Sequence, residues 1–173
     1  MAPLHRSSAL PLLALTCLAC IVSCGPAGPE TEVIAPGEPG VTLGYYHNDD
    51  DYQPLTTVAE APVLWGLQGG TWTMPSVRIR GIASPALVWG TVTLEDGSGP
   101  GEVLGDTERE QGFAPAADGS LESRIALPIQ HAPPRQFDSI SDLYGQTARL
   151  EVMASDAHGR GASSSVLVKL VED

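Results

Sequence analysis

Three cysteines near the start of the chain are the first residues whose spacing could do chemistry. Cys17 and Cys20 have the C-x-x-C spacing of zinc and redox sites, and Cys24 follows them. A structural zinc site needs four ligands, and no cysteine follows position 24. A redox pair needs a polar approach to the thiolate, whereas the apolar runs ALPLLALT and IV flank these residues. The context therefore argues against both kinds of site.

The apolar run from Ala9 to Val22 has the features of a secretory signal. It follows the basic residue Arg6, contains Pro11 and is shorter than the roughly 20 residues that a membrane-spanning helix needs. We therefore expect residues 1–23 to be a signal peptide.

The end of this run, Ile-Val-Ser-Cys at 21–24, resembles the lipobox of bacterial prolipoproteins, and the resemblance covers residues 1–28. It implies that Cys24 is lipidated and that acyl chains such as palmitate hold the protein at a membrane. Cys20 is a competing position, although Cys17 then stands where the lipobox has an aliphatic residue. An ordinary cleaved signal is the alternative, and it would leave Cys24 as a free thiol.

The resemblance also bears on the location of the protein. In families with this signal, Asp after the lipidated cysteine often means retention in the inner membrane. Gly25 stands there in this chain, which implies the outer membrane of a bacterial cell envelope. The formal net charge of −12 argues against nucleic acid and against anionic lipid headgroups as partners.

The rest of the chain divides into a linker and a body. Residues 24–40 are rich in Pro and Gly, which predicts a disordered tether that lifts the body off the membrane. Residues 41–173 are predicted to form one β-sandwich domain, because short apolar runs alternate with turn residues. The predicted strands are 41–46, 55–60, 62–68, 76–82, 86–96, 120–129, 148–156 and 164–172.

Side chains in several of these strands alternate with a period of two. Val77 and Ile79 fall on one side of their strand while Arg78 and Arg80 fall on the other. The only predicted helix is a short one over 136–144. Eight such strands predict an all-β fold, an immunoglobulin-like antiparallel β-sandwich of 7–8 strands.

The last two strands form the clearest predicted hairpin, with a turn from Asp156 to Gly159. This stretch resembles the closing hairpin of immunoglobulin-like and cadherin-like domains of bacterial surface proteins. Tyr144, just before the hairpin, is either a tyrosine corner or an ordinary buried tyrosine.

Tryptophans mark the most distinctive part of the body. Trp65 and Trp72 flank Gln-Gly-Gly, and this segment resembles a recurrent Q-G-G-aromatic stretch of uncharacterised bacterial lipoproteins. Gly69-Gly70 is predicted to be a two-residue hairpin turn that brings the two rings together. With Trp89 they would form an exposed platform for sugar rings, or they would fill the core, which is the commoner role of tryptophan in small β domains.

Two stretches of the sequence are rich in acidic residues. Asp49, Asp50 and Asp51 could supply oxygen ligands to calcium, but the spacing of a calcium loop is absent. We expect a solvated acidic loop there and another over 99–112.

Catalytic signatures are missing from the sequence. Asp156, His158 and one of the serines at 163–165 could form a triad only if hairpin side chains turned inward. We therefore expect neither an enzyme nor a cofactor. The expected function is a lipid-anchored envelope module that binds protein partners, with carbohydrate binding through Trp65, Trp72 and Trp89 as the alternative and a calcium-stabilised module as the third possibility.

Overall fold

The computed structural model describes residues 32–47, 51–56, 59–66, 70–95, 101–129 and 139–173. The predicted signal peptide and lipidation site, with Cys17, Cys20 and Cys24, lie outside these residues. Within the range predicted as linker, Val33–Ile34 form strand β1, and Ala35 is buried.

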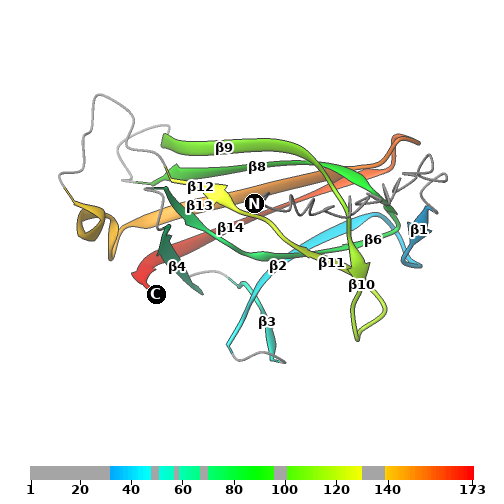
Figure 1. The fold of residues 1–173 in the computed structure, drawn as a ribbon, viewed down its shortest axis with the longest axis horizontal. Helices are drawn as coiled ribbons and strands as arrows, with labels where there is room; N and C mark the ends of the chain where they lie inside the picture. Colours follow the sequence, from blue (N-terminus) through cyan, green and yellow to red (C-terminus); the bar gives the residue numbers. More distant parts are fainter. Residues whose placement is uncertain (1–31, 48–50, 57–58, 67–69, 96–100, 130–138) are drawn as a thin grey trace, which may run out of the picture. The chain divides into compact units, whose positions relative to one another are not determined.

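Two large β-sheets make up the body of the protein (Figure 1). The five-stranded sheet has the order β10 (Ala114–Pro115), β11 (Leu121–Arg124), β6 (Ser76–Arg80), β2 (Gly40–Tyr46) and β3 (Tyr52–Pro54). The seven-stranded sheet has the order β12 (Leu127–Pro128), β5 (Thr71–Thr73), β4 (Ala59–Trp65), β14 (Gly161–Glu172), β13 (Thr147–Ser155), β8 (Ala86–Leu94) and β9 (Glu102–Gln111). A small third sheet pairs β1 with β7 (Ala83–Ser84). The predicted all-β sandwich is confirmed.

Alternation along the strands creates the core between the two sheets. Val77 and Ile79 of β6 are fully buried, while Arg78 and Arg80 lie on the outer face of the five-stranded sheet. The seven-stranded sheet contributes buried side chains from three neighbouring strands, Val88, Val92, Leu150, Val152, Val168 and Leu170. These side chains form one continuous cluster, so the two sheets share a single core.

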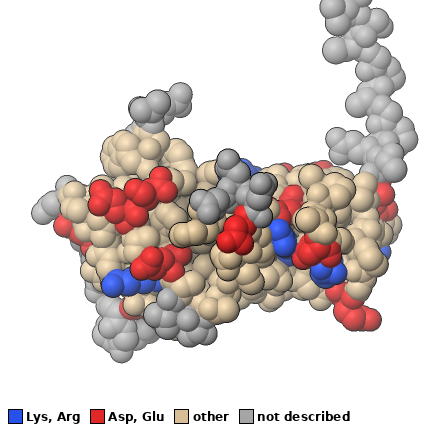
Figure 2. All heavy atoms as spheres, turned by 90° about the horizontal axis from the view of Figure 1, so that it is seen from below, with Lys and Arg blue, Asp and Glu red and all other residues tan. Residues whose placement is uncertain are grey.

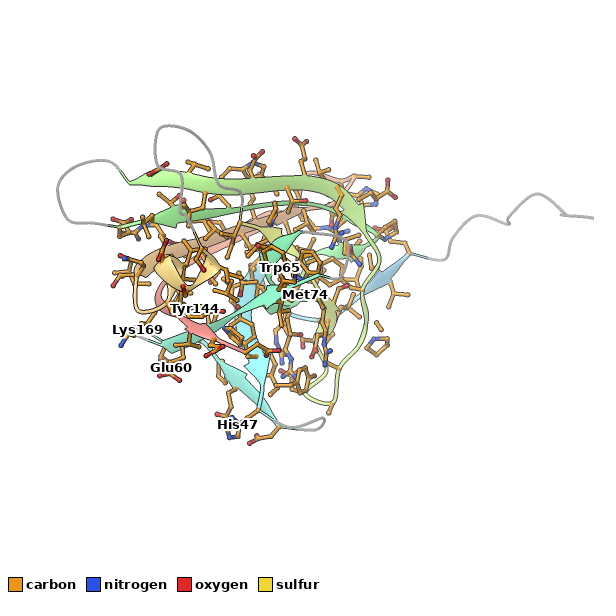
Figure 3. The ribbon with its side chains drawn as sticks, turned by 60° about the vertical axis from the view of Figure 1, so that its left-hand side comes forward. His47, Glu60, Trp65, Met74, Tyr144 and Lys169 are labelled. Atoms are coloured by element: carbon orange, nitrogen blue, oxygen red, sulfur yellow. The ribbon has the colours of Figure 1, made fainter. Side chains whose placement is uncertain are left out.

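Most strand pairs are antiparallel, but β14 and β4 run parallel, with Leu170 opposite Ala61. Lys169 lies opposite Glu60 in this pair, and Figure 3 shows the two labelled side chains near one another. A parallel pair needs a long connection between its strands. Here β5 to β13 lie between β4 and β14 in the chain.

Several predicted boundaries were wrong. The separate strands expected over 55–60 and 62–68 are replaced by the single strand β4 (Ala59–Trp65), with Leu55 and Thr56 outside it. The stretch 120–129 is split into β11 and β12. Residues 136–138 of the predicted helix lie outside the described residues, and a single 3₁₀ turn covers Ile140–Leu143.

The largest correction concerns the stretch expected to be an acidic loop over 99–112. Glu102–Gln111 form β9, which pairs along its length with β8. The period-two signal is weak because β9 is an edge strand, and Leu104 is its only buried hydrophobic side chain. An edge strand needs few apolar residues, so its sequence resembles that of a loop.

Candidate functional site

A charged cluster lies on the outer face of the five-stranded sheet, where the register aligns Thr42, Arg78 and Glu122 in one row. Arg78 Nε donates to Glu122 Oε2 at 2.7 Å, and both side chains are largely shielded, at 14% and 15% exposure. Ser76 and Tyr46 donate their hydroxyl groups to the same carboxylate, at 2.5 and 2.8 Å. Glu122 therefore has three donors around it.

Tyr52 covers the middle of this cluster. Gly44 makes room for its ring, because a Cβ atom at position 44 would lie 2.4 Å from Tyr52 Cζ. The Arg78 guanidinium lies over the ring, 3.5 Å from its centroid, and the Tyr46 ring meets it edge-on at 5.7 Å. Neighbouring groups thus fix the position of the Tyr52 ring.

The electrostatics of the cluster follow from these contacts. Burial opposes ionisation of Glu122, but the hydrogen bonds from Ser76, Tyr46 and Arg78 outweigh it and lower the pKa of this carboxyl. Burial raises the pKa of Tyr52 to about 12, with the charge of Arg78 opposing the rise. The Tyr52 hydroxyl is buried without a hydrogen-bond partner among the described residues. All of these groups keep their ordinary charge near neutral pH.

Asp118 adds a second carboxylate to this face. It lies 3.3 Å from Arg78 Nη1 and 3.2 Å from Arg80 Nη2. Hydrogen bonds from the Ser120 hydroxyl and backbone amide lower the pKa of Asp118 to about 2. Acidic and basic side chains lie next to one another on the face that Figure 2 shows. Because Arg78 and Glu122 satisfy each other, we interpret the cluster as a structural brace of the sheet.

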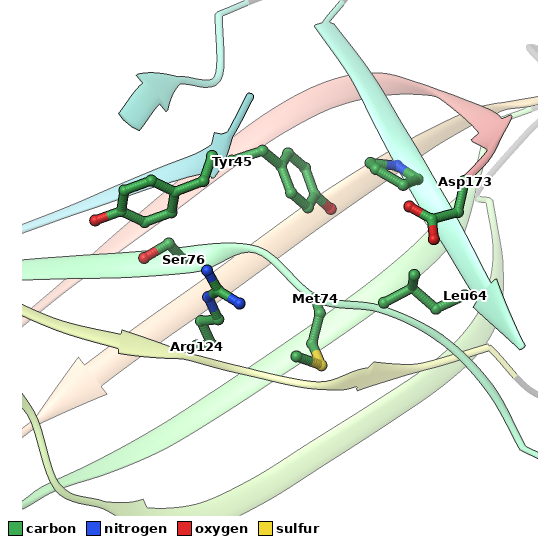
Figure 4. Close-up of a pocket in the computed structure, with 8 residues that line it drawn as sticks. Tyr45, Leu64, Met74, Ser76, Arg124 and Asp173 are labelled. Carbon is green, nitrogen blue, oxygen red and sulfur yellow. The ribbon is translucent and has the colours of Figure 1, made fainter. Parts of the chain in front are cut away.

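A hollow of about 160 Å³ lies beside the brace (Figure 4). Its lining includes Leu64 and Asp173 on one side and Ser76 and Arg124 on the other, with Met74 between them. This volume is small compared with the roughly 300–1,000 Å³ of sites that enclose small molecules. The hollow is therefore too small to enclose an ordinary small-molecule ligand.

The turn between β13 and β14 matches its sequence prediction. Asp156 N donates to Arg160 O at 3.0 Å, and Gly159 takes a φ of +78°. The Asp156 carboxylate is buried and accepts four hydrogen bonds, from the amides of Ala83, His158 and Arg160 and from Arg160 Nε, at 2.7–3.1 Å. Burial opposes its ionisation, but these bonds lower the pKa of Asp156 to about 2. The carboxylate thus joins the hairpin to β7.

This arrangement does not assemble the triad that the sequence allowed. Asp156 faces Arg160, whereas the His158 ring is 60% exposed and its Nε2 lies 2.9 Å from Glu32. Ser163 and Ser165 lie exposed along β14. Asp156 and His158 therefore serve the turn and its contact with Glu32, which precedes β1.

The tryptophans of the β4–β5 hairpin lie on opposite faces of the sheet. Leu64 is opposite Trp72 and Trp65 is opposite Thr71, so the two tryptophans differ by one position in register. The predicted two-residue turn at Gly69-Gly70 was wrong, because Trp65 pairs with Thr71 and Gly66 N donates to Gly70 O at 2.8 Å, while residues 67–69 lie outside the described residues. The ring of Trp72 fills the space beside Gly66 and Gly70, where a Cβ atom at position 66 would lie 2.1 Å from it.

None of the three tryptophans belongs to the buried core. Trp65 is 61% exposed, and Trp72 and Trp89 are half-buried. The expectation that they fill the core was therefore wrong. Trp89 lies on β8, separated from the β4–β5 hairpin by β14 and β13 in the sheet order. The structure does not bring the three rings together into one platform.

A second outer surface surrounds Trp89. Its cross-strand neighbours are Met153 on β13 and Glu108 on β9, and Leu87 lies two positions away on β8. Leu87 and Met153 are each 44% exposed. We call Leu87, Trp89 and Met153 the Trp89 patch. It is a partly exposed apolar area on the outer face of the seven-stranded sheet, and such areas commonly mark contact sites.

An acidic row borders this patch on the side of β9. Asp106, Glu108 and Glu110 alternate along the strand and are all exposed, so their carboxylates lie on the same outer face. No Lys, Arg or His of the described residues forms an ion pair with any of the three. We call these residues the acidic row. In contrast to Glu122, their charges have no ion-pair partner within the described part of the chain.

The acidic stretch at 47–53 follows β2, runs into β3 and is described only in part. Asp49 and Asp50 lie outside the described residues, and Asp51 is exposed and accepts a hydrogen bond from Gln53 at 2.8 Å. His47 stands at the far end of the β2–β3 hairpin (Figure 3). Within the described ranges, no group of three or more His, Cys, Asp or Glu side chains is placed to hold a metal ion.

Tyr144 packs against the core, half-buried, next to the 3₁₀ turn. The following residues dock on β14, because Gly145 N donates to Leu170 O at 2.8 Å. Among the residues that the structure describes, no helix is both long and apolar enough to cross a bilayer.

Sequence reasoning missed both the Arg78–Glu122 brace and the acidic row. The brace joins residues 44 positions apart, and only the register of β11 on β6 brings them together. The acidic row has a local signal in the sequence, the alternation of Asp106, Glu108 and Glu110, but exposed acidic residues are equally typical of a solvated loop. Alternation of polar side chains is therefore also a signal of an edge strand.

Comparison with known proteins found no match to a family model, to a curated protein or to a solved structure.

Proposed function

We propose that this protein is a non-catalytic module of the bacterial cell envelope that is lipid-anchored through Cys24, in the outer membrane, and binds protein partners. The anchor rests on the lipobox-like residues 21–24 and the short apolar run before them. Residues between the anchor and β1 would then give the body reach from the membrane surface.

The observation that carries the binding role is the pairing of the Trp89 patch with the acidic row. Interfaces are commonly centred on aromatic and methionine side chains, with charged residues at the rim. Trp89 and Met153 provide the apolar centre, and Glu108 lies directly beside Trp89. The brace around Arg78 is a weaker candidate, because its charges already have partners.

A photo-crosslinking amino acid at position 153 in living cells tests this function. We expect a discrete adduct with another envelope protein, because Met153 is exposed at the centre of the patch. The same amino acid at Thr42, exposed on the other sheet, is the matched control. A failure to form any adduct at position 153, or equal adducts at both positions, would contradict the proposal.

The anchor has its own test. The intact mass of the native protein should equal that of a chain beginning at Cys24 and carrying acyl chains. Cys24→Ser should move the protein from the membrane fraction to the soluble fraction. An unmodified native chain that begins at another residue would rule out the anchor.

Carbohydrate binding is the second candidate function, and the 61% exposure of Trp65 favours it. An exposed indole can stack on a sugar ring. Tyr52 is less suited to this role, because Arg78 already covers its ring. A titration with envelope glycans, followed by tryptophan fluorescence, should change the emission of the native protein but not of Trp65→Phe. Unchanged emission of the native protein would end this hypothesis.

A further inference from the structure

We infer that the free edge of β9 binds an extended basic segment of a partner protein, which adds to the seven-stranded sheet as one more strand. This inference rests on the proposed function and names the partner's chemistry. β9 is the last strand in the sheet order, so its outer edge has no strand beside it among the described residues. Such an edge offers unpaired backbone groups to an incoming strand.

The available part of the edge is the second half of β9. Near its start, β12 packs closely, since a Cβ atom at Gly105 would lie 2.2 Å from the carbonyl oxygen of Pro128. From Asp106 to Glu110 the strand carries four exposed side chains, which are those of Asp106, Glu108, Arg109 and Glu110. The other sheet ends in β3 and β10, which have only 3 and 2 residues, so β9 is the longest edge strand described.

The acidic row sets the sequence pattern of the partner. Alternate residues of a strand repeat every 6.8 Å, roughly, so the three carboxylates match side chains at every second position of a second strand. Lys or Arg at these positions would lie directly opposite Asp106, Glu108 and Glu110, and opposite charges stabilise such cross-strand pairs. The expected segment is therefore extended, with basic residues at alternate positions.

The same row disfavours a second copy of this chain as the occupant. In an antiparallel pair of two β9 strands centred on Glu108, each Glu108 would face its counterpart, and Asp106 would face Glu110 of the other copy. Like charges directly opposite one another destabilise a strand pair. The edge is thus protected from self-association while its backbone stays available to a basic strand.

The Trp89 patch extends the contact beyond the edge. On β8, Trp89 lies next to Glu108 and Leu87 lies next to Glu110, and Met153 follows on β13. A partner whose basic strand is followed by apolar residues could therefore fold back over this patch. The charges would select the strand, and the patch would bury apolar area.

A synthetic peptide with lysine at every second position and threonine or valine between tests the inference. Added to the full-length protein, it should slow hydrogen exchange at β9 amides between Asp106 and Gln111 that point away from β8. A peptide of the same composition with its lysines in one block should bind about tenfold more weakly, because it cannot match the spacing. Equal binding of the two peptides would overturn the inference.

Two variants and one modified peptide separate strand addition from simple charge attraction. Glu108→Lys should weaken binding about tenfold, since an attractive pair becomes repulsive. Glu172→Lys, the same charge change at an exposed position of β14, should leave binding unchanged and is the matched control. The alternating peptide with N-methyl groups on its pairing edge should lose the exchange protection. Retained protection, or equal effects of both variants, would contradict strand addition.

These outcomes are distinct from failure of the proposed function. An adduct at position 153 whose yield is unaffected by Glu108→Lys would overturn strand addition at β9 and leave the protein-binding role intact. Absence of any adduct at position 153, together with no peptide binding, would overturn both.

Discussion

The buried carboxylate of Asp156 offers the sharpest test of how this fold is held together. Its side chain is 1% exposed, and it accepts hydrogen bonds from three backbone amides and from Arg160 Nε. In Asp156→Asn, one of the two oxygens becomes an NH₂ group, which cannot accept from its donors. The buried donors then lose their acceptor, and the charge partner of Arg160 disappears.

The expected magnitude follows from the pKa and from the lost bonds. The pKa of Asp156 falls from 3.8 to about 2 in the folded protein. This difference corresponds to about 2 kcal/mol of stability from the ionised form. Mismatched hydrogen bonds add to it, so we expect Asp156→Asn to lower the free energy of unfolding by about 3 kcal/mol. For a domain of this size the Tm should fall by about 6–12 °C.

The stabilisation by Asp156 should depend on pH in one direction. The folded pKa of Asp156 is depressed, so its stabilisation is complete above pH 3.8 and is lost as the pH falls towards 2. Urea unfolding, followed by circular dichroism at several pH values, should show a large difference between the native protein and Asp156→Asn at pH 6. That difference should shrink on acidification.

The control is Asp106→Asn, which changes an exposed carboxylate without a described ion-pair partner. It should alter the free energy of unfolding by less than about 0.5 kcal/mol. A difference between Asp156→Asn and the native protein that is below about 1 kcal/mol at pH 6, or that does not vary with pH, would refute the reasoning.

Further predictions concern the brace and the exposed indole. In urea unfolding, Gly44→Ala should lower the free energy of unfolding by about 1–3 kcal/mol, because the added methyl group collides with the ring of Tyr52. Gly112→Ala is the control and should be nearly neutral, because no atom lies within 4 Å of the added methyl group. In the same assay, Arg78→Met should lower the free energy of unfolding by about 2–4 kcal/mol, because the shielded carboxylate of Glu122 loses its ion pair. Arg80→Met should lower it by less than about 1 kcal/mol, because the Arg80 side chain is 45% exposed. Equal losses from the two arginine variants would contradict the brace. Trp65→Phe should remove most acrylamide quenching of the tryptophan emission, since Trp65 is 61% exposed, and unchanged quenching would show that another indole is the accessible one.

Much of the sheet could be predicted from local alternation. The strands β2, β6, β8, β13 and β14 lie within two or three residues of their predicted bounds, because buried and exposed positions alternate along them. The turn at Asp156 was also predictable, since it needs an acidic side chain for the amides and a glycine for positive φ. These features depend on neighbours within a few positions.

Other features could not be predicted because they depend on long-range pairing. The acidic residues of β9 resemble a solvated loop until β8 is placed beside them. The opposite orientations of Trp65 and Trp72 follow from a one-residue difference in register, because Trp72 pairs with Leu64 rather than with Trp65. Of the three tryptophans predicted to form a site, Trp89 lies in the proposed binding surface. Trp65 and Trp72 lie elsewhere, on the β4–β5 hairpin.

The sequence by itself determined that the body is made of strands, roughly where β2, β6, β8, β13 and β14 lie, and which of their side chains share a face. It also contained the acidic alternation of β9 and the lipobox-like residues 21–24. Only the tertiary structure decided which strands are neighbours, that β14 and β4 run parallel, and that Arg78 meets Glu122 while the acidic row has no ion-pair partner among the described residues. The physical reason is that the alternation of buried and exposed side chains is a property of each strand by itself. Which strands pair depends on how the two sheets together bury one core.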